Sequence, residues 1–368
     1  MVPSWVISAI VVTIAGMALS ILLIPVLSRF GHRFELLDHP AGRKQHDSPV
    51  PLVGGLTILT AGFVALAVGT FWRHHTGGFS WWFLGAVCLM LLLGVCDDAF
   101  GLSYKTKFFL QAIVVLSLII LTQLKVSTLG HILGGGAIHL EYMAIPFTLL
   151  CLVGYINAAN MIDGLDGLAG GIALISLVFL AAYLILLHLF GWLTDVLAFA
   201  GATLGFLAYN LRTPWRHQAA VFLGDGGSLL LGLVVGWFAI RVISQPGAHT
   251  VSPASVAWIL ALPVIDTLVV MGRRLLSGHN PFRADRHHMH HTLIDIGFSH
   301  SQATWVLLLL ASLYGLYGLM GYVFGLPDWI FFCSFLLMLL LHAAFALFSH
   351  RLASSRSMEI ESLDSVSR

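Results

Sequence analysis

The chain alternates between long apolar runs and short polar segments along almost its whole length. A helix needs roughly 20 mostly apolar residues to cross a bilayer, and eleven runs come close to that length. The pattern predicts an all-α polytopic integral membrane protein with about eleven transmembrane helices. The expected spans are 4–28, 52–71, 81–96, 108–126, 143–159, 168–189, 194–211, 227–243, 254–272, 303–324 and 329–349.

Composition agrees with this pattern. Hydrophobic residues make up 58% of the chain and charged residues 10%, and the mean hydropathy is +0.92. These values exclude an ordinary soluble domain. We expect one transmembrane domain over 1–350 and a flexible, polar tail over 351–368.

The charges indicate how the chain is oriented. If the eleven spans alternate in direction, one face receives fifteen of the eighteen Lys and Arg residues. By the positive-inside rule this face is cytoplasmic, so the N-terminus lies outside and the C-terminus inside. The same face receives Asp97, Asp98, Asp163, Asp166 and Asp225. We therefore expect a polar cleft at the cytoplasmic ends of the helices.

Two acidic segments are candidates for cation binding. In "CDDAFGLSYKTK", Asp97 and Asp98 are adjacent carboxylates that need a nearby cation, and Lys107 follows them. In "NAANMIDGLDG", Asn157, Asn160 and Asp163 recur at helical spacing among glycines that allow a tight turn and a close ligand. Their oxygens suit Mg²⁺ or Mn²⁺. Ordinary solvated or capped helix ends are the alternative for both.

A third segment, "AVFLGDGGS", places Asp225 between glycines directly before an apolar run. Backbone N–H groups beside a carboxylate at a helix N-terminus suit a metal ion with a phosphate. The segment has no GK[ST] and so is not a Walker A loop. A simple glycine turn is the alternative.

The segment "NPFRADRHHMHHTL" concentrates basic residues. It admits a polyphosphate-binding loop, a solvated turn or a zinc site, and the first is favoured because neither Cys nor an HExxH motif is near. Its candidate ligands are Arg283, Arg286, His288, His290 and His291.

Two further features are single observations. Asp266 lies inside an apolar run, where a carboxylate is costly and points to function; it could pair with Arg273 or Arg274. The basic N-terminal loop could hold an anionic lipid headgroup through Lys44 and its neighbours.

Taken in order, these segments resemble the polyprenyl-phosphate N-acetylhexosamine-1-phosphate transferases. The resemblance rests on "HDSPVPLVGGL", "DDAFGLSYKTKFFLQ", "NAANMIDGLDGLAGG", "FLGDGGS" and "PVIDTLVVMGRRLLSGHNPFRADRHHMHH". The "DRHHMHH" and "PVIDT…RR" segments are similar to the branch that uses UDP-GlcNAc and undecaprenyl phosphate. The muramoyl-pentapeptide branch carries consecutive histidines followed by Glu, whereas this chain has Met289 and Thr292.

The resemblance implies roles on the lipid-phosphate side. Asp225 is expected to bind Mg²⁺, or alternatively Mn²⁺, with Asn160 as the second protein ligand. Asp97 and Asp98 are expected at the lipid phosphate, one of them as base or metal partner, and Lys107 is expected to hold a phosphate.

On the donor side, the resemblance implies that Asp166 binds the uracil edge while Phe222 stacks on the ring and Asn210 lies near. The diphosphate and sugar are expected to contact the histidine loop, and Asp163 to organise the metal and diphosphate. The expected contacts also include Asn157, Arg283, Arg286, His288, His290 and His291.

The implied function is transfer of GlcNAc-1-phosphate from UDP-GlcNAc to undecaprenyl phosphate, with release of UMP. The product would begin an O-antigen or related envelope polymer at the bacterial inner membrane. A homodimer is compatible with this function, and no nucleic-acid partner is expected. The alternatives are another UDP-HexNAc or UDP-MurNAc-pentapeptide donor, or a nucleotide-sugar or cation transporter. Transporters commonly carry internal repeats and midplane charges, whereas most acids and histidines of this sequence lie at one surface and no repeat is visible.

Overall fold

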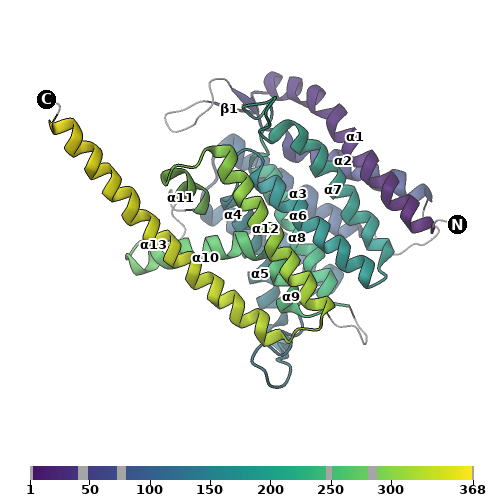
Figure 1. The fold of residues 1–368 in the computed structure, drawn as a ribbon. Coiled ribbons are helices and arrows are strands. Elements are labelled where there is room, and N and C mark those ends of the chain that lie inside the picture. The colour runs from purple at the N-terminus through teal and green to yellow at the C-terminus, as the bar shows by residue number, and fades with distance from the viewer. Residues whose placement is uncertain (1–2, 40–48, 73–79, 246–250, 281–287, 367–368) are drawn as a thin grey trace.

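The computed structural model describes residues 3–39, 49–72, 80–245, 251–280 and 288–366, which form a bundle of long helices (Figure 1). The elements follow in the order α1 (Ser4–Arg33), β1 (Leu37–Asp38), β2 (Val50–Pro51), α2 (Gly54–Trp72), α3 (Trp81–Phe100), α4 (Tyr104–Thr122), η1 (Glu141–Met143), α5 (Ala144–Met161), α6 (Leu168–Leu186), α7 (Phe190–Asn210), α8 (Gly224–Ile243), α9 (Pro253–Ala257), η2 (Trp258–Leu260), α10 (Ala261–Leu276), α11 (Met289–Asp295), α12 (His300–Val323) and α13 (Asp328–Val366).

The prediction of an all-α membrane protein is confirmed. Within the described residues, ten helical spans are long and apolar enough to cross a membrane. The one remaining predicted span, 52–71, corresponds to α2, whose apolar part, Gly54–Gly69, is shorter. The strands β1 and β2 are two residues each and pair antiparallel beside the end of α1.

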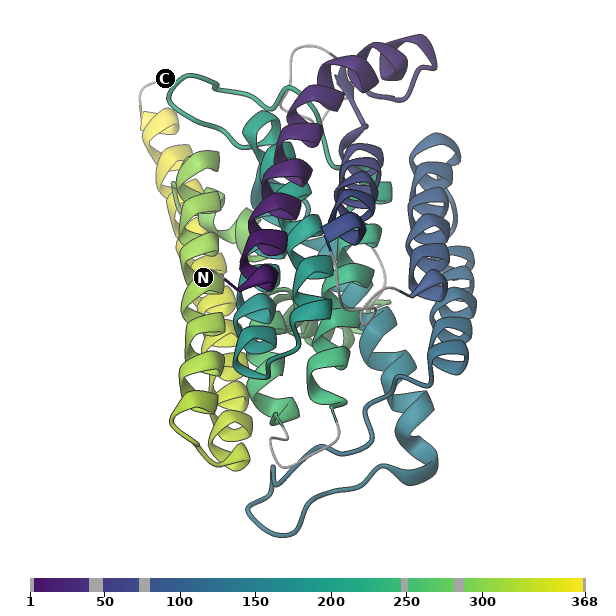
Figure 2. The same ribbon diagram turned by 90° about the vertical axis from the view of Figure 1, so that its right-hand side faces the viewer.

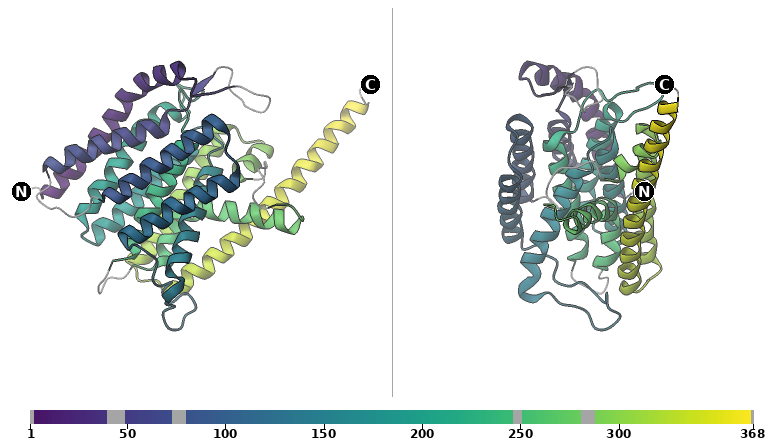
Figure 3. Two further views of the ribbon diagram at one scale, coloured as in Figure 1. Left: turned by 180° about the vertical axis from the view of Figure 1, so that it is seen from behind. Right: turned by 90° about the vertical axis from the view of Figure 1, so that its left-hand side faces the viewer.

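Helix α8 is the central helix of the bundle. In its most apolar window 89% of the residues are buried, and it packs against α2, α3, α5 and α6. Helices α3 and α4 cover one flank while α12 and α13 lie on the opposite flank (Figures 2 and 3). The N-terminus of α8 carries Asp225, so the bundle surrounds this residue on several sides.

Local sequence signals set the helix ends near Asp225. Ser103 caps α4 by accepting a hydrogen bond from the Thr106 amide, so the helix begins at Tyr104, ahead of the predicted 108. Helix α3 ends at Gly101, whose φ of 65° is a left-handed conformation that glycine adopts at little cost. The resulting tight hairpin brings Lys107 back beside the last turn of α3.

Glycines allow three helices to meet at the start of α8. A Cβ atom at Gly94 of α3 would overlap the backbone of Gly226, and one at Gly55 of α2 would overlap that of Gly227. The glycines of "GDGG" therefore serve close helix packing.

The last helix departs from the rest of the bundle. Helix α13 begins beside the end of α12, crosses α10 and then extends away from the body (Figures 1 and 3). Where the sequence predicts a flexible tail after His350, α13 continues as helix to Val366.

We predict that Gly94→Ala destabilises the protein whereas Gly85→Ala, on the same helix, does not. The added methyl at Gly94 meets the Gly226 backbone, and overpacking of this kind costs about 1–3 kcal/mol. Nothing lies within 4 Å of a Cβ atom at Gly85. Thermal unfolding in detergent measures both variants, and equal midpoints would contradict the close packing of α3 on α8.

Candidate active site

The site is built around the carboxylate of Asp225. Its Oδ1 accepts a hydrogen bond of 2.8 Å from Asn160 Nδ2 on α5. Its Oδ2 accepts one of 3.1 Å from Lys107 Nζ on α4. Lys107 also forms an ion pair with Asp97 on α3. Four helices are thus joined by side chains that the sequence predicts to lie together.

Asp98 binds the N-terminus of α8. Its carboxylate accepts hydrogen bonds from the backbone amides of Asp225, at 3.0 Å, and Gly226, at 3.3 Å. We expected these amides to bind a phosphate, whereas in this structure they are paired with Asp98. The helix dipole favours a carboxylate at this position.

A cavity of about 620 Å³ opens beside this cluster. Its volume falls in the range of small-molecule binding sites. Among the predicted site residues, its wall includes Asp98, Asp163, Asp166, Asn210, Phe222, Asp225 and His291. The sequence therefore predicts much of its lining.

Other predicted residues lie elsewhere. The side chains of Lys107 and Asn160 bind Asp225, which lines the cavity, and Asp97 binds Lys107. These three residues are thus connected to the cavity wall through Asp225. Asn157, His288 and His290 are not among the lining residues in the described part of the chain. Lys44, Arg283 and Arg286 lie outside the described residues.

Asp166 is held at the cavity wall by a residue that the sequence analysis missed. Its Oδ2 accepts hydrogen bonds from Arg212 Nε at 2.6 Å and from the Ala219 amide at 3.2 Å. Arg212 also lines the cavity. A basic residue directly after the apolar run 194–211 was the available signal.

Asn210 stabilises the cavity wall through two hydrogen bonds to the backbone. Its Oδ1 accepts a hydrogen bond from the Gly167 amide, and its Nδ2 donates one to the Val221 carbonyl. It thereby ties the start of α6 to the segment that carries Phe222.

Asn157 has a structural partner. Its Nδ2 donates hydrogen bonds to Gln111 Oε1 at 2.5 Å and to the Val153 carbonyl at 2.8 Å. This polar pair joins α4 to α5 one turn from Lys107 and Asn160. Gln111, buried within an apolar run, was also missed.

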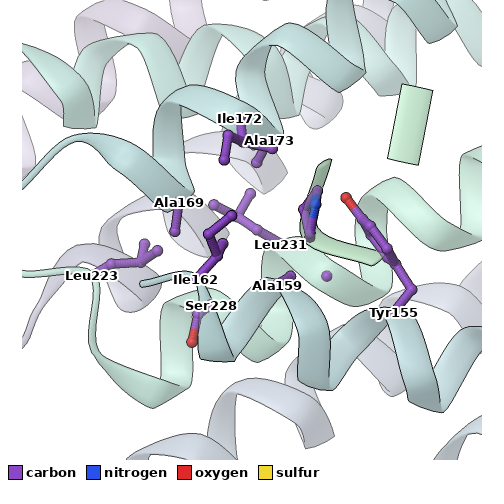
Figure 4. Close-up of a pocket in the computed structure, with 11 residues that line it drawn as sticks. Tyr155, Ala159, Ile162, Ala169, Ile172, Ala173, Leu223, Ser228 and Leu231 are labelled. Atoms are coloured by element: carbon purple, nitrogen blue, oxygen red, sulfur yellow. The ribbon is translucent and has the colours of Figure 1, made fainter. Parts of the chain in front are cut away.

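A small second cavity lies beside the polar cluster. It holds about 10 Å³ between α5, α6 and α8 and is lined mostly by apolar side chains, with Ser228 and Tyr155 well apart (Figure 4). Ser228 Oγ accepts a hydrogen bond from Asn160 Nδ2, so the polar network ends where this apolar lining begins.

The histidine segment is partly buried. His290 packs against Gly164, where a Cβ atom would overlap its ring. Burial, and then the neighbouring His291, lower the pKa of His290 to about 3, so it is neutral at pH 7. The glycines expected to admit a ligand here instead admit protein side chains, since Cβ atoms at Gly167 and Gly171 would meet Leu211 and Leu308.

Asp266 shows what an intramembrane carboxylate binds in this protein. Its partners are His288 Nδ1 at 2.8 Å, the Met289 amide at 2.8 Å and His342 Nε2 at 3.5 Å. The expected pairing with Arg273 or Arg274 is thus replaced by histidines. His342, on α13, was missed because its partner lies 76 residues away in the sequence.

The cavity has an excess of negative charge. Asp163 faces it, and partial desolvation, followed by the charges of Asp225, Asp98 and Asp166, raises the pKa of Asp163 to about 8. Within the described chain no three His, Cys, Asp or Glu residues form a ready-made metal site. Mg²⁺ commonly uses one or two carboxylates and completes its shell with water and phosphate. The oxygen donors and uncompensated charge fit that mode, whereas they do not fit zinc.

The fold and the cavity together define a multi-pass membrane protein with an acidic cavity at one end of its bundle. The chain belongs to glycosyl transferase family 4, whose family model matches residues 80–243.

Curated relatives support the same membership. The chain is 33% identical over 311 residues to the undecaprenyl-phosphate alpha-N-acetylglucosaminyl 1-phosphate transferase of Yersinia pestis, covering 83% of each protein. It is 32% identical to the protein of that name from Escherichia coli strain K12, covering 83% of this chain and 82% of the relative. It is 34% identical to a probable undecaprenyl-phosphate N-acetylglucosaminyl 1-phosphate transferase of Bacillus subtilis strain 168, covering 83% of each.

We predict that Asp163→Asn weakens the dependence of stability on pH in chelator-containing buffer. The pKa of Asp163 in the folded state lies above the usual value of about 3.9. Between about pH 4 and 8 the folded protein therefore retains a proton that the unfolded chain has already released. Stability therefore falls as pH rises through this window. Thermal midpoints at pH 5 and pH 8 test this: the wild type should lose more than the variant, and equal losses would contradict the shift.

Proposed function

We propose that this protein transfers GlcNAc-1-phosphate from UDP-GlcNAc to undecaprenyl phosphate, forming undecaprenyl-diphospho-GlcNAc and releasing UMP. The observation that carries the proposal is the joining of Asp225, Lys107 and Asn160 at the end of the central helix, beside a cavity of about 620 Å³. The names of the curated relatives supply the acceptor and the transferred group.

In the proposed reaction, the lipid phosphate replaces UMP in the phosphoanhydride bond to the sugar-linked phosphorus. A phosphate oxygen of the lipid attacks the sugar-linked phosphorus of the donor, and the bond to the UMP phosphate breaks. The sugar C1–O bond stays intact, so the anomeric configuration is kept. Such a transfer depends mainly on in-line positioning and charge neutralisation.

The cluster around Asp225 suits the neutralising task. Asp225 would hold Mg²⁺, with Asn160 contributing its Oδ1 because its Nδ2 donates to Asp225. When bound, the ion supplies positive charge to the diphosphate oxygens. Lys107 supplies a second positive charge at the same end of the cavity, and Mn²⁺ is the alternative ion.

Asp97 and Asp98 act as positioning groups in this proposal. Asp97 holds Lys107 and accepts a hydrogen bond of 2.7 Å from the Leu102 amide. Asp98 holds the two amides at the start of α8. A phosphate monoester has a second pKa near about 6 and is already ionised at neutral pH, so the acceptor needs no strong base.

Donor recognition is assigned to the other side of the cavity. Asp166, positioned by Arg212, would accept from the uracil edge while Phe222 contacts the ring. His291 would approach the diphosphate or sugar from α11. Recognition of the sugar therefore rests on the segment between α10 and α12.

We place the cavity on the cytoplasmic side of a bacterial inner membrane, with the N-terminus outside and the C-terminus inside. Lys107 and Arg212 lie at the cavity end of the bundle, which supports this orientation through the positive-inside rule. The soluble donor and the membrane-bound acceptor can meet there.

The proposal is tested by UMP release from purified protein in detergent, with undecaprenyl phosphate and Mg²⁺. UDP-GlcNAc, UDP-GalNAc and UDP-MurNAc-pentapeptide are supplied in separate reactions. We expect release with UDP-GlcNAc that requires both lipid and metal. Release with the pentapeptide donor alone would reassign the substrate, and no release from folded protein with any donor would refute the transferase activity.

We predict different kinetic effects for Asp225→Ala and Asp166→Ala. The first should lower kcat by about three orders of magnitude, as expected for loss of a main charge-stabilising contact. The second should raise the donor KM about 10- to 100-fold, since a hydrogen bond to a charged group contributes about 1.5–3 kcal/mol. Glu141→Gln, at an exposed carboxylate of η1 that is not among the residues lining the cavity, is the control and should change neither constant. A fully active Asp225→Ala enzyme would remove the metal assignment.

A further inference from the structure

One buried cluster is not explained by metal or donor contacts. Asp266 of α10 is 2% exposed and His342 of α13 is 6% exposed. They belong to two apolar helices, α10 and α13, that cross each other (Figures 1 and 3), and their side chains lie 3.5 Å apart. Burying these groups is costly unless they find polar partners.

His342 is unusual on its own helix. Much of α13 is exposed on the surface of the bundle, as at Leu336, Leu337, Leu340 and Leu341. The buried positions recur at helical spacing and include Phe331, His342 and Ala346. A leucine would fill this apolar seam without a desolvation cost, so the imidazole indicates a polar task.

The contacts of Asp266 show what the imidazole of His342 is joined to. Its Oδ1 receives the Met289 amide and lies 3.5 Å from His342 Nε2, while its Oδ2 receives His288 Nδ1. Asp266 therefore fixes both the ring of His288 and the first residue of α11. The contact with Nδ1 also sets the tautomer of His288, leaving Nε2 on its far side.

The connection reaches the cavity through a row of neighbouring histidine rings. The His288 and His290 rings are nearly parallel, with an interplanar angle of 6° and centroids 5.8 Å apart. The His290 and His291 centroids are 4.2 Å apart. His291 is the member of this row that lines the cavity.

We propose that His342 is a positioning residue of the donor site: together with Asp266 it fixes the start of α11 and so places His291 at the cavity wall. The last helix thus takes part in donor binding without touching the donor. The kinetic consequence rests on the proposed transferase function, whereas the geometry of the histidines does not.

The test compares His342→Leu, which removes the polar partner, with His342→Gln, whose amide can replace Nε2. Leu340→Ala, on the exposed side of α13, is the matched control. Outer partners of this kind typically contribute about 10- to 100-fold, so we expect His342→Leu to raise the donor KM by about tenfold or more. Glutamine should restore most of this loss, and the control should leave KM unchanged.

A spectroscopic readout separates positioning from general loss of structure. In protein with ¹⁵N-labelled histidine, the Nδ1–H signal of His288, assigned with His288→Gln, should shift in His342→Leu and not in the control. Asp266→Asn should displace the same signal. Its effect on KM should not add to that of His342→Leu, because the two residues act through one contact.

An unchanged donor KM with an unchanged His288 signal in folded His342→Leu would overturn the proposal, and so would additive effects in the double variant. If leucine prevents folding, His342→Asn gives the same comparison, since its shorter amide cannot reach Asp266. If the wild type releases no UMP, the proposed function fails, while the ¹⁵N signals still decide the positioning role.

Discussion

The site depends on one lysine shared by two carboxylates. Lys107 of α4 binds Asp97 of α3 and Asp225 of α8, so a single cation joins the ends of α3 and α8, which would otherwise present like charges to one another. Near the edge of a bilayer such repulsion is weakly screened, and its compensation is correspondingly valuable. Asn160 and Asp98 complete the arrangement by holding Asp225 from two further directions.

Polar groups at different depths in the bundle follow different rules. Near the end of the bundle, carboxylates outnumber their cations around an open cavity, a surplus suited to a bound ion. Deeper in the bundle, polar side chains bind one another, as Gln111 does with Asn157 and Asp266 with His288. The difference reflects the cost of an uncompensated charge away from water. Charge available for chemistry therefore lies near the surface, and charge used for shape lies within.

The sequence could predict the helices because bilayer thickness sets the length of each apolar run. The run at 143–159 became Ala144–Met161, and that at 227–243 became Gly224–Ile243. It could also predict that Asp225, Asn160 and Lys107 gather, since alternating spans bring their ends to one side. It could not predict which groups pair, because a partner's identity depends on helix rotation and packing. Asp98 binds amides expected for phosphate, and His342 and Arg212 have partners distant in sequence.

The cap that Asp98 provides also bears on how a reaction cycle would end. In a site where phosphates bind backbone amides, a departing product leaves those amides unpaired, and this cost slows its release. Here the amides of Asp225 and Gly226 are paired with Asp98 within the protein, so a departing product would not leave them without a partner. UMP would then be retained mainly by side chains and the metal ion. Its hold on the enzyme, and thus the extent of product inhibition, would follow the concentration of free divalent cation.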